Sequence, residues 1–189
     1  MRKIVVAVTG ASGAIYAQLL VQRLCQMKEQ VAEVALIVSD CGREVFIHEL
    51  GQTAWDALQS LPVKHYNNND FFSPCASGSA RYSAMLVTPC SMGTLARIAH
   101  GIADTLIART ADVMLKERRH LVLMPREAPY NLIHLRNMQQ IVEAGGVICP
   151  ASPAFYYHPA TLEDAANSLV DRILQLAGIQ TDSPEWGGC

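Results

Sequence analysis

The sequence lacks the marks of a membrane-spanning or nucleic-acid-binding protein. No apolar run approaches the roughly 18 residues that a membrane-spanning helix needs. The net charge is −2 and no basic block occurs, which argues against a protein dedicated to nucleic acid. Lysine is scarce, with 4 residues against 11 arginines, and arginine is suited to bidentate binding of phosphate or carboxylate. This balance is a weak indication of an anionic ligand.

Sequence signatures of metal and redox sites are also missing. The six cysteines are widely spaced without a Cys-x-x-Cys pair, and no His-Glu-x-x-His occurs. Zinc and thioredoxin-like sites therefore lose support, and we expect no metal. Reduced thiols and a cytoplasmic location are the default expectation.

Two classes of nucleotide-binding protein are excluded because the residues that their chemistry needs are absent. A P-loop needs a Gly-Lys dipeptide, which is absent. A short-chain dehydrogenase needs Tyr-x-x-x-Lys for proton transfer, and none of the six tyrosines has a lysine four positions later. An anionic ligand would therefore have to be held by some other arrangement.

What is present is an alternation of apolar segments that predicts one α/β domain. Half of the 189 residues are hydrophobic, which allows a sizeable core. Continuous apolar runs predict strands over Lys3–Val8, Glu33–Ser39, Ala84–Thr88, His120–Met124 and Gly146–Cys149. Helical patterns predict helices over Gly13–Met27, Arg43–Leu50, Thr53–Leu61, Ser91–Gly101, Ala103–Glu117, Tyr130–Ala144 and Thr161–Ala177. This alternation predicts a three-layer fold, a parallel sheet with helices on both faces.

Two segments fall outside the alternation. Asn67–Ser83 is rich in asparagine, serine and glycine and predicts a long loop, of the kind that often carries function. Residues 180–189 show no periodicity and predict a tail after a single domain of residues 1–179. The tail contains Trp186, and we expect it to pack on a neighbouring subunit.

Small polar residues follow the predicted strands, where open α/β sheets bind ligands. Thr9-Gly10-Ala11-Ser12-Gly13 joins the first strand to the first helix, so glycines can turn tightly and the helix can offer free N–H groups to an anion. Its Gly-x-x-Gly spacing predicts a phosphate or mononucleotide site, with an ordinary tight turn as the alternative. Ser91 follows the third predicted strand as a natural helix cap that can also hold a phosphate or carbonyl.

Four charged residues carry the sharpest chemical signal. Arg109 and Lys116 are seven positions apart on a predicted helix and therefore share a face. Arg126 and Glu127 come directly after a predicted strand. We expect the three cations to converge and neutralise a phosphate leaving group, with Glu127 transferring a proton or orienting a substrate. A solvated ion-pair network is the alternative.

Four further residues have simpler interpretations when they are taken alone. Arg118 and Arg119 are best interpreted as part of a solvated surface network. Tyr156 is expected to take part in the aromatic packing of a loop, and Arg172 to face solvent from the last helix.

Five motifs together resemble those of one known family, the UbiX/Pad flavin prenyltransferases. They are Thr-Gly-Ala-Ser-Gly-Ala at 9–14, Pro-Cys-Ser-x-Gly-Thr-Leu at 89–95, Ala-Asp-Val-x-Leu-Lys-Glu-Arg-Arg at 111–119, Pro-Arg-Glu-Ala-Pro at 125–129 and Pro-Ala-Phe-Tyr at 153–156. They occur in the order of the family and at about its spacing. The resemblance covers nearly the whole chain, and the combination is far more specific than any single motif.

This resemblance implies a flavodoxin-like or Rossmann-like flavoprotein that assembles as a homododecamer. It implies that reduced FMN is joined to dimethylallyl monophosphate without a metal, first at the flavin N5 and then by ring closure at C6. The product, prenylated FMN, serves decarboxylases of the UbiD type.

The resemblance also assigns roles to individual residues. It implies catalytic roles for Glu127 and Ser12. It implies FMN binding by Gly10, Ala11, Ser12, Ser39, Ser91, Thr94 and Arg126. It implies prenyl-phosphate binding by Arg109, Lys116, Tyr156 and Arg172. The Ser77-Gly78-Ser79 segment matches a mobile loop near a neighbouring subunit's site, and Phe71 and Phe72 stand where other members place a tryptophan.

Two other functions stay open on the sequence. One is an FMN-dependent decarboxylase acting directly on an aromatic or cysteine-derived carboxylate, although the cysteine branch typically carries a Met-Asn dipeptide that this chain lacks. The other is a carrier that binds and delivers FMN. The receiving decarboxylase, the choice between monophosphate and diphosphate, and the roles of individual cysteines are likewise open.

Overall fold

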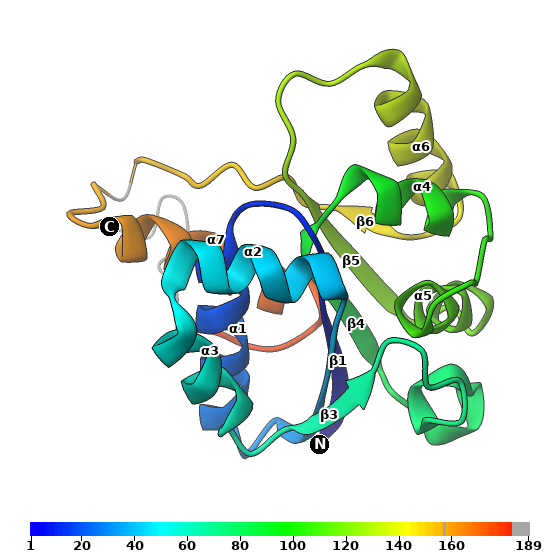
Figure 1. Ribbon diagram of the computed structural model, residues 1–189, viewed down its shortest axis with the longest axis horizontal. Helices are drawn as coiled ribbons and strands as arrows, with labels where there is room; N and C mark the ends of the chain where they lie inside the picture. The colour runs from blue at the N-terminus through cyan, green and yellow to red at the C-terminus, as the bar shows by residue number, and fades with distance from the viewer. Residues whose placement is uncertain (157, 183–189) are drawn as a thin grey trace.

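The computed structural model describes residues 1–156 and 158–182, and it contains a six-stranded parallel sheet (Figure 1). The strands are β1 Arg2–Val8, β2 Val31–Val38, β3 Lys64–Asn67, β4 Ala84–Cys90, β5 His120–Pro125 and β6 Val147–Ile148. Their order across the sheet is β3-β2-β1-β4-β5-β6, and every neighbouring pair is parallel. The chain therefore reverses its direction of winding between β1 and β4, which is where such sheets bind ligands.

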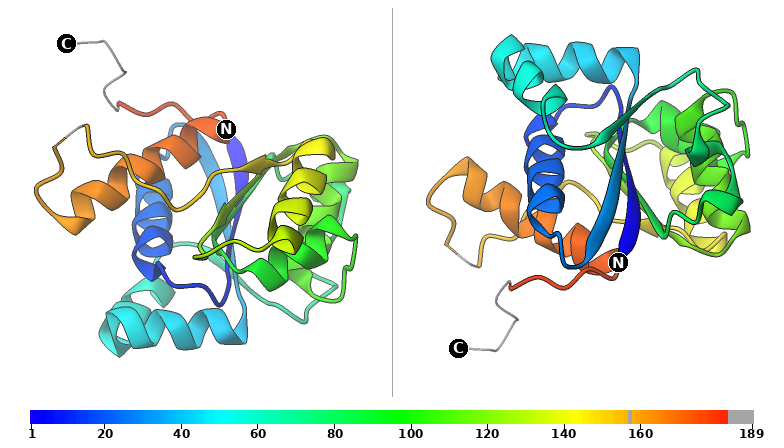
Figure 2. Two further views of the ribbon diagram at one scale, coloured as in Figure 1. Left: turned by 90° about the horizontal axis from the view of Figure 1, so that it is seen from above. Right: turned by 90° about the horizontal axis from the view of Figure 1, so that it is seen from below.

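Helices cover both faces of the sheet, which confirms the predicted three-layer α/β fold (Figure 2). They are α1 Ala14–Gln26, α2 Asp40–Leu50, α3 Gln52–Gln59, α4 Met92–Ala99, α5 Leu106–Lys116, α6 Leu132–Glu143 and α7 Leu162–Leu176. In β1, Ile4 and Val6 pack toward α1, α2, α3 and α7, whereas Val5 and Ala7 pack toward α4, α5 and α6. Because both faces are covered, β1 is continuously apolar from Ile4 to Val8 rather than alternating.

The predicted long loop is more ordered than its composition suggests. It follows β3, a strand that pairs with β2, was not predicted and shares only Asn67 with the predicted loop. Two short 3-10 helices follow, η1 Pro74–Ala76 and η2 Gly78–Ala80. The buried Tyr82 hydroxyl donates to Glu33 Oε1 at 2.6 Å, which ties the end of the loop to the amino end of β2.

The end of the described chain returns to the turn after α1. Gln180 N donates to Gln30 Oε1 at 2.9 Å, and Gln30 Nε2 donates to the Gln180 carbonyl at 3.0 Å. Trp186 and the rest of the tail beyond residue 182 lie outside the described residues, so its packing on a neighbour stays a prediction. Within 1–156 and 158–182, no helix combines the length and apolarity that crossing a membrane requires.

Candidate active site

Thr9 joins the ends of β1 and β4 at the point where the winding reverses. Its hydroxyl donates to the Pro89 carbonyl at 3.0 Å and accepts from Ser91 N at 2.7 Å. Its own backbone N–H also donates to Pro89 O at 3.2 Å. The Thr9 side chain is buried, so these bonds fix the turns that follow the two central strands relative to one another.

We expect Thr9→Val to lower the free energy of unfolding by about 1–3 kcal/mol, because it leaves the half-buried Ser91 N–H without its acceptor and removes one of the two hydrogen bonds to the Pro89 carbonyl. Chemical denaturation measures the loss. Thr9→Ser is the matched control, since it keeps the hydroxyl and should retain most of the stability. A valine variant as stable as the wild type would show that the hydroxyl does not hold the two turns together.

The turn after β1 presents its polar atoms outward. Gly10 and Ser12 are exposed, whereas Ala11 is buried. Gly13 precedes α1 with a φ of 113°, in the left-handed region that favours glycine, and provides no side-chain cap for the helix. The first N–H groups of α1 therefore need a partner from elsewhere.

That partner is Glu49, which sequence reasoning did not identify. Its carboxylate accepts from Gly13 N at 3.0 Å and from Ala14 N at 2.8 Å. Glu49 lies at the far end of α2 and belongs to none of the recognised motifs, so no local signal marked it. The predicted anion-binding turn thus holds an anion of its own chain.

Glu49 gathers Ser12 and Arg126 around it, and these three residues form the Ser12 cluster. Burial raises the pKa of Glu49, but hydrogen bonds from Ser12, Ala14 and Gly13 and the Arg126 charge together lower it. Arg126 Nε also donates to the Ser12 carbonyl at 3.3 Å. The carboxylate is therefore ionised near neutral pH and lies beside a hydroxyl and a guanidinium.

Glu49→Gln should destabilise the protein by about 0.3–1 kcal/mol at neutral pH, because it removes a charge from the N-terminus of α1. Since the folded pKa is lowered, this stabilisation is complete above the usual carboxyl pKa of about 4.3 and is lost as the pH falls through the folded value. Unfolding midpoints of both proteins, measured between pH 3 and 7, should therefore converge at the acid end. The control is Glu29→Gln, an exposed carboxylate in the turn before β2. A gap that stays constant down to pH 3 would exclude this ionic cap.

Two serines cap helices directly after the carboxyl ends of β2 and β4, as expected for Ser91. Ser91 Oγ accepts from Thr94 N at 3.3 Å and donates to Thr94 Oγ1 at 3.1 Å. Ser39 Oγ accepts from Gly42 N at 3.0 Å, which starts α2 three residues before the predicted position. The Thr94 hydroxyl keeps its own hydrogen for a ligand.

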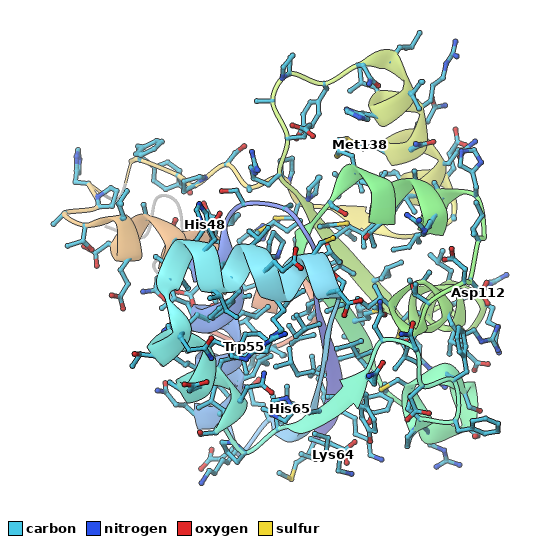
Figure 3. The ribbon with its side chains drawn as sticks, in the orientation of Figure 1. His48, Trp55, Lys64, His65, Asp112 and Met138 are labelled. Carbon is cyan, nitrogen blue, oxygen red and sulfur yellow. The ribbon has the colours of Figure 1, made fainter. Side chains whose placement is uncertain are left out.

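A cavity of about 220 Å³ opens beside Ser39. Trp55 and His65, both marked in Figure 3, line it together with Arg43. The Arg43 guanidinium lies 5.9 Å from the centroid of the Trp55 ring. This cavity lies away from the centre of the sheet, toward its β3 edge.

Glu127 follows Arg126 of the Ser12 cluster in the chain. Its side chain is exposed, and Oε1 accepts from Ala128 N at 3.0 Å. Together the hydroxyls, the guanidinium and the two carboxylates suit a phosphate-bearing ligand that exchanges a proton. Among residues 1–156 and 158–182 no group of three or more histidine, cysteine, aspartate or glutamate side chains is placed to hold a metal ion.

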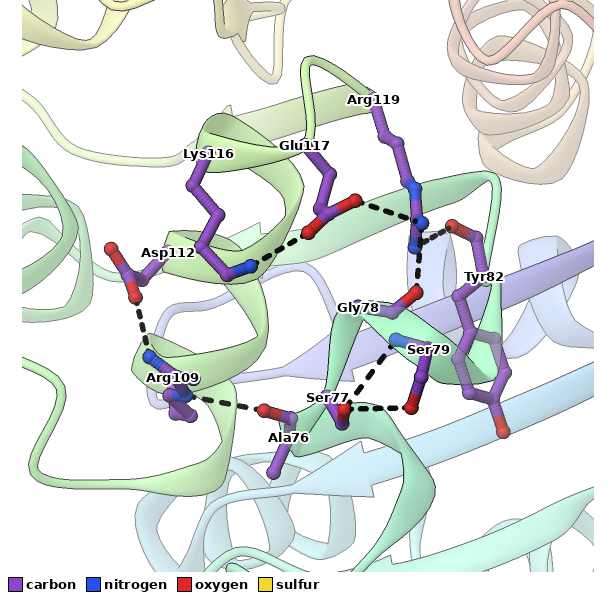
Figure 4. Close-up of polar contacts among 10 residues, drawn as sticks. All are labelled: Ala76, Ser77, Gly78, Ser79, Tyr82, Arg109, Asp112, Lys116, Glu117 and Arg119. Atoms are coloured by element: carbon purple, nitrogen blue, oxygen red, sulfur yellow. Dashed lines mark hydrogen bonds and ion pairs between the residues drawn. The ribbon is translucent and has the colours of Figure 1, made fainter.

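Lys116 does not lie beside Arg126 within one chain, so the structure of a single chain does not bring the three cations together, and their convergence stays a prediction. Lys116 ends α5 just before β5 begins, whereas Arg126 follows the end of β5. Six strand residues at roughly 3.3 Å each put about 20 Å between the two ends. Arg109 donates to the Ala76 carbonyl at 3.2 Å and to Asp112 at 2.8 Å (Figure 4).

Arg119 is not the solvated residue that the sequence suggested. Its side chain is 20% exposed and donates to the carbonyls of Gly78 at 2.8 Å and Tyr82 at 3.1 Å (Figure 4). Arg118, by contrast, is exposed. The arginine pair therefore divides into one residue that binds the loop and one on the surface.

The last two candidates lie on the C-terminal part of the chain. Tyr156 is 50% exposed, in the irregular segment before α7. Arg172 is exposed on α7, as expected, and donates to Gln175 Oε1 at 3.4 Å. Its charge counteracts the rise that burial causes in the pKa of Cys149, which follows β6. Arg172 therefore lies on the side of the sheet where β5 and β6 end.

Comparison with known proteins gives consistent matches over the whole chain. A family model described as Flavoprotein matches residues 1–177. The flavin prenyltransferase UbiX of Methanocaldococcus jannaschii is 44% identical over 186 residues, covering 98% of each chain. The flavin prenyltransferase UbiX of Pseudomonas aeruginosa is 41% identical over 196 residues, covering 98% of this chain and 94% of the relative.

Solved structures agree with these relatives. AnUbiX (PadA1), in complex with FMN and dimethylallyl pyrophosphate, superposes with a TM-score of 0.91 at 43% identity and covers 100% of this chain and 98% of its own. A dodecameric FMN-dependent UbiX-like decarboxylase from Escherichia coli O157:H7 has a TM-score of 0.91 at 39% identity, covering 98% and 100%. The peptidyl-cysteine decarboxylase EpiD, at 17% identity and a TM-score of 0.64, shares the fold alone.

Proposed function

The chain belongs to the UbiX flavin prenyltransferases within the flavoprotein family, and we propose that it joins reduced FMN to a dimethylallyl phosphate ester to make prenylated FMN. The observation that carries this proposal is the Ser12 cluster, which brings a hydroxyl, a carboxylate and a guanidinium together where β1 and β5 end, with the Glu127 carboxyl group on the next residue of the chain. The cysteine-decarboxylase neighbours share only the fold and give no support to a direct cysteine decarboxylase. The Escherichia coli neighbour is itself named a decarboxylase, so direct decarboxylation is the second candidate function.

The polar groups at this edge fit FMN. Its phosphate needs donors, and Ser39, Ser91 and Thr94 supply hydroxyls at the ends of β2 and β4. The backbone of Gly10 and Ala11 and the Arg126 guanidinium would hold the flavin ring at the end of β1. When bound, reduced FMN supplies the electron pairs that form the new bonds from N5 and C6 to the prenyl carbons.

We assign proton handling to the carboxyl groups of the Ser12 cluster and its neighbour. Glu127 has one oxygen on Ala128 N and another left for a substrate proton. Ser12 is hydrogen-bonded to Glu49, so a proton can pass between hydroxyl and carboxylate without entering bulk water. The Arg126 charge adds to the hydrogen bonds that lower the pKa of Glu49, and Arg126 Nε donates to the Ser12 carbonyl.

The phosphate of the prenyl donor needs cations from a second copy of the chain. Lys116 lies at the opposite end of β5 from Arg126, too far to serve the site of its own subunit, and Arg109 shares its helix. A UbiX-like relative is dodecameric, so we propose that α5 of one subunit completes the site of its neighbour, together with Tyr156 and Arg172. Cations held there stabilise the negative charge that develops as the allylic C–O bond breaks and phosphate leaves with the electron pair.

Finer points of the proposal follow the resemblance. We propose a homododecamer, a reaction that needs no metal, dimethylallyl monophosphate as donor and a UbiD-type decarboxylase as recipient. The bound donor in the AnUbiX structure is the pyrophosphate, so both esters need to be compared.

The test is an anaerobic incubation with reduced FMN and either dimethylallyl ester, followed by mass analysis of the released flavin. A flavin heavier by one dimethylallyl unit is the expected product. Release of CO₂ from a carboxylate substrate without a prenyl donor would instead favour the direct decarboxylase. Tightly bound but unchanged FMN would favour the carrier.

A further inference from the structure

A compact group of charges joins the end of α5 to the Ser77–Ser79 segment (Figure 4). Glu117 Oε1 accepts from Lys116 Nζ at 2.6 Å, and Oε2 accepts from Arg119 Nη2 at 3.2 Å. The same Arg119 guanidinium binds the Gly78 carbonyl. We call Lys116, Glu117, Arg119 and Gly78 the Glu117 clamp.

The backbone after α5 is shaped to form this clamp. Successive helical residues normally point in different directions, so Lys116 and Glu117 would not meet on a continuing helix. Here Glu117 is the C-cap of α5, and Arg118 has a φ of 54°, in the left-handed region. This reversal brings the side chains on both sides of Arg118 toward the loop while Arg118 itself stays exposed.

Gly78 completes the contact on the side of the loop. A Cβ added there would lie 2.7 Å from Glu117 Cδ, closer than real Cβ atoms approach, and 3.1 Å from its Cγ. The carboxylate therefore packs directly on the backbone of the Ser77–Ser79 segment, and any larger residue at position 78 would have to displace it.

In the clamp, Glu117 orients the Lys116 side chain without fully neutralising its positive charge. The hydrogen bond and charge of Lys116, with the charge of Arg119, lower the pKa of Glu117, so the carboxylate is ionised near neutral pH. Its single charge is shared between two cations. Lys116 is 47% exposed and has three N–H donors, of which the clamp uses one.

We propose that Glu117 is a positioning residue for the prenyl donor: it holds the Lys116 ammonium in one direction and fixes the Ser77–Ser79 segment beside it. This inference rests on the proposed function, in which Lys116 binds the donor phosphate. A free lysine side chain would have to lose its rotational freedom when phosphate binds, and the clamp removes that freedom in advance.

The test compares Glu117→Gln, Glu117→Asp and the wild type in the full-length oligomer. Removing an ordering contact made equally before and during the reaction raises KM with little change in kcat. We expect the KM for dimethylallyl monophosphate to rise about tenfold in Glu117→Gln, as loss of one charge-assisted hydrogen bond implies, with the KM for FMN unchanged. Titrating the flavin-free protein with dimethylallyl monophosphate should show a matching rise in Kd, and Glu117→Asp should recover part of it.

Two further variants keep the outcome interpretable. Gly78→Ala displaces the carboxylate without removing a charge and should raise the same KM, even if Glu117→Gln fails to fold. Glu29→Gln is the matched control and should leave both constants unchanged. An unchanged donor KM in a folded Glu117→Gln would overturn the inference, and a lower one would show that Glu117 competes with phosphate for Lys116 instead. If the wild type makes no prenylated flavin, the proposed function fails rather than the clamp.

Discussion

Glu127→Gln is expected to lower the rate of prenyl transfer by about 10²–10⁴-fold while FMN still binds, because a positioned general acid or base contributes that much. Glutamine keeps the shape of the side chain and can still accept from Ala128 N, as Glu127 Oε1 does at 3.0 Å. It cannot accept a proton at neutral pH. Single-turnover formation of the heavier flavin measures the chemical step apart from product release.

Two comparisons make this result specific. FMN titration of the variant should give an unchanged Kd, since the flavin-binding groups assigned above are intact. Glu29→Gln should turn over at the wild-type rate. Full activity in Glu127→Gln would remove Glu127 from the chemistry and leave Glu49 as the carboxylate to test next.

Mixed oligomers are expected to recover activity that neither parent has. Lys116→Ala should lower kcat/KM by about 10²–10³-fold, as loss of a cation on a departing phosphate does. If Lys116 serves the neighbour's Glu127, coexpressing Lys116→Ala with Glu127→Gln in equal amounts leaves about a quarter of the sites complete in a symmetric oligomer. Specific activity of the purified mixture should then reach about that share of the wild type.

The matched control combines two defects on the same helix. Arg109 and Lys116 both belong to α5 and share a face, so a mixture of Arg109→Ala with Lys116→Ala contains no complete α5 and should stay inactive. Activity in the mixture of Arg109→Ala with Lys116→Ala would contradict the proposal, and so would a lack of activity in the mixture of Lys116→Ala with Glu127→Gln. Either result would mean that Lys116 of one subunit does not serve the Glu127 site of its neighbour. Gel filtration of each mixture confirms that the variants assemble together.

The sequence predicted the central fold well because the buried strands are continuous apolar runs. β1, β2, β4 and β5 are recognisable for that reason, and the capping role of Ser91 follows from its place between strand and helix. β3 was missed because Lys64-His65-Tyr66-Asn67 is a polar edge strand without an apolar signal. Its existence depends on the long-range pairing with β2.

The site was predictable only where local motifs carry it. Ser12 and Arg126 follow strand ends, and the structure brings them together. Glu49 escaped notice because its role depends on α2 folding back over the start of α1, which no short motif encodes. Arg119 was misjudged because the carbonyls that it binds belong to a loop about 40 residues earlier. Contacts between distant segments are what the sequence alone does not reveal.

The two edge strands of the sheet, β3 and β6, offer little backbone for another strand to pair with. β3 has four residues, of which Lys64, His65 and Asn67 are exposed, and β6 has two residues. Short or charged edge strands discourage the edge-to-edge pairing that would extend a sheet from one molecule to the next. In the proposed oligomer, we therefore expect the contacts between copies of this chain to be made by helices and loops rather than by continuing the sheet.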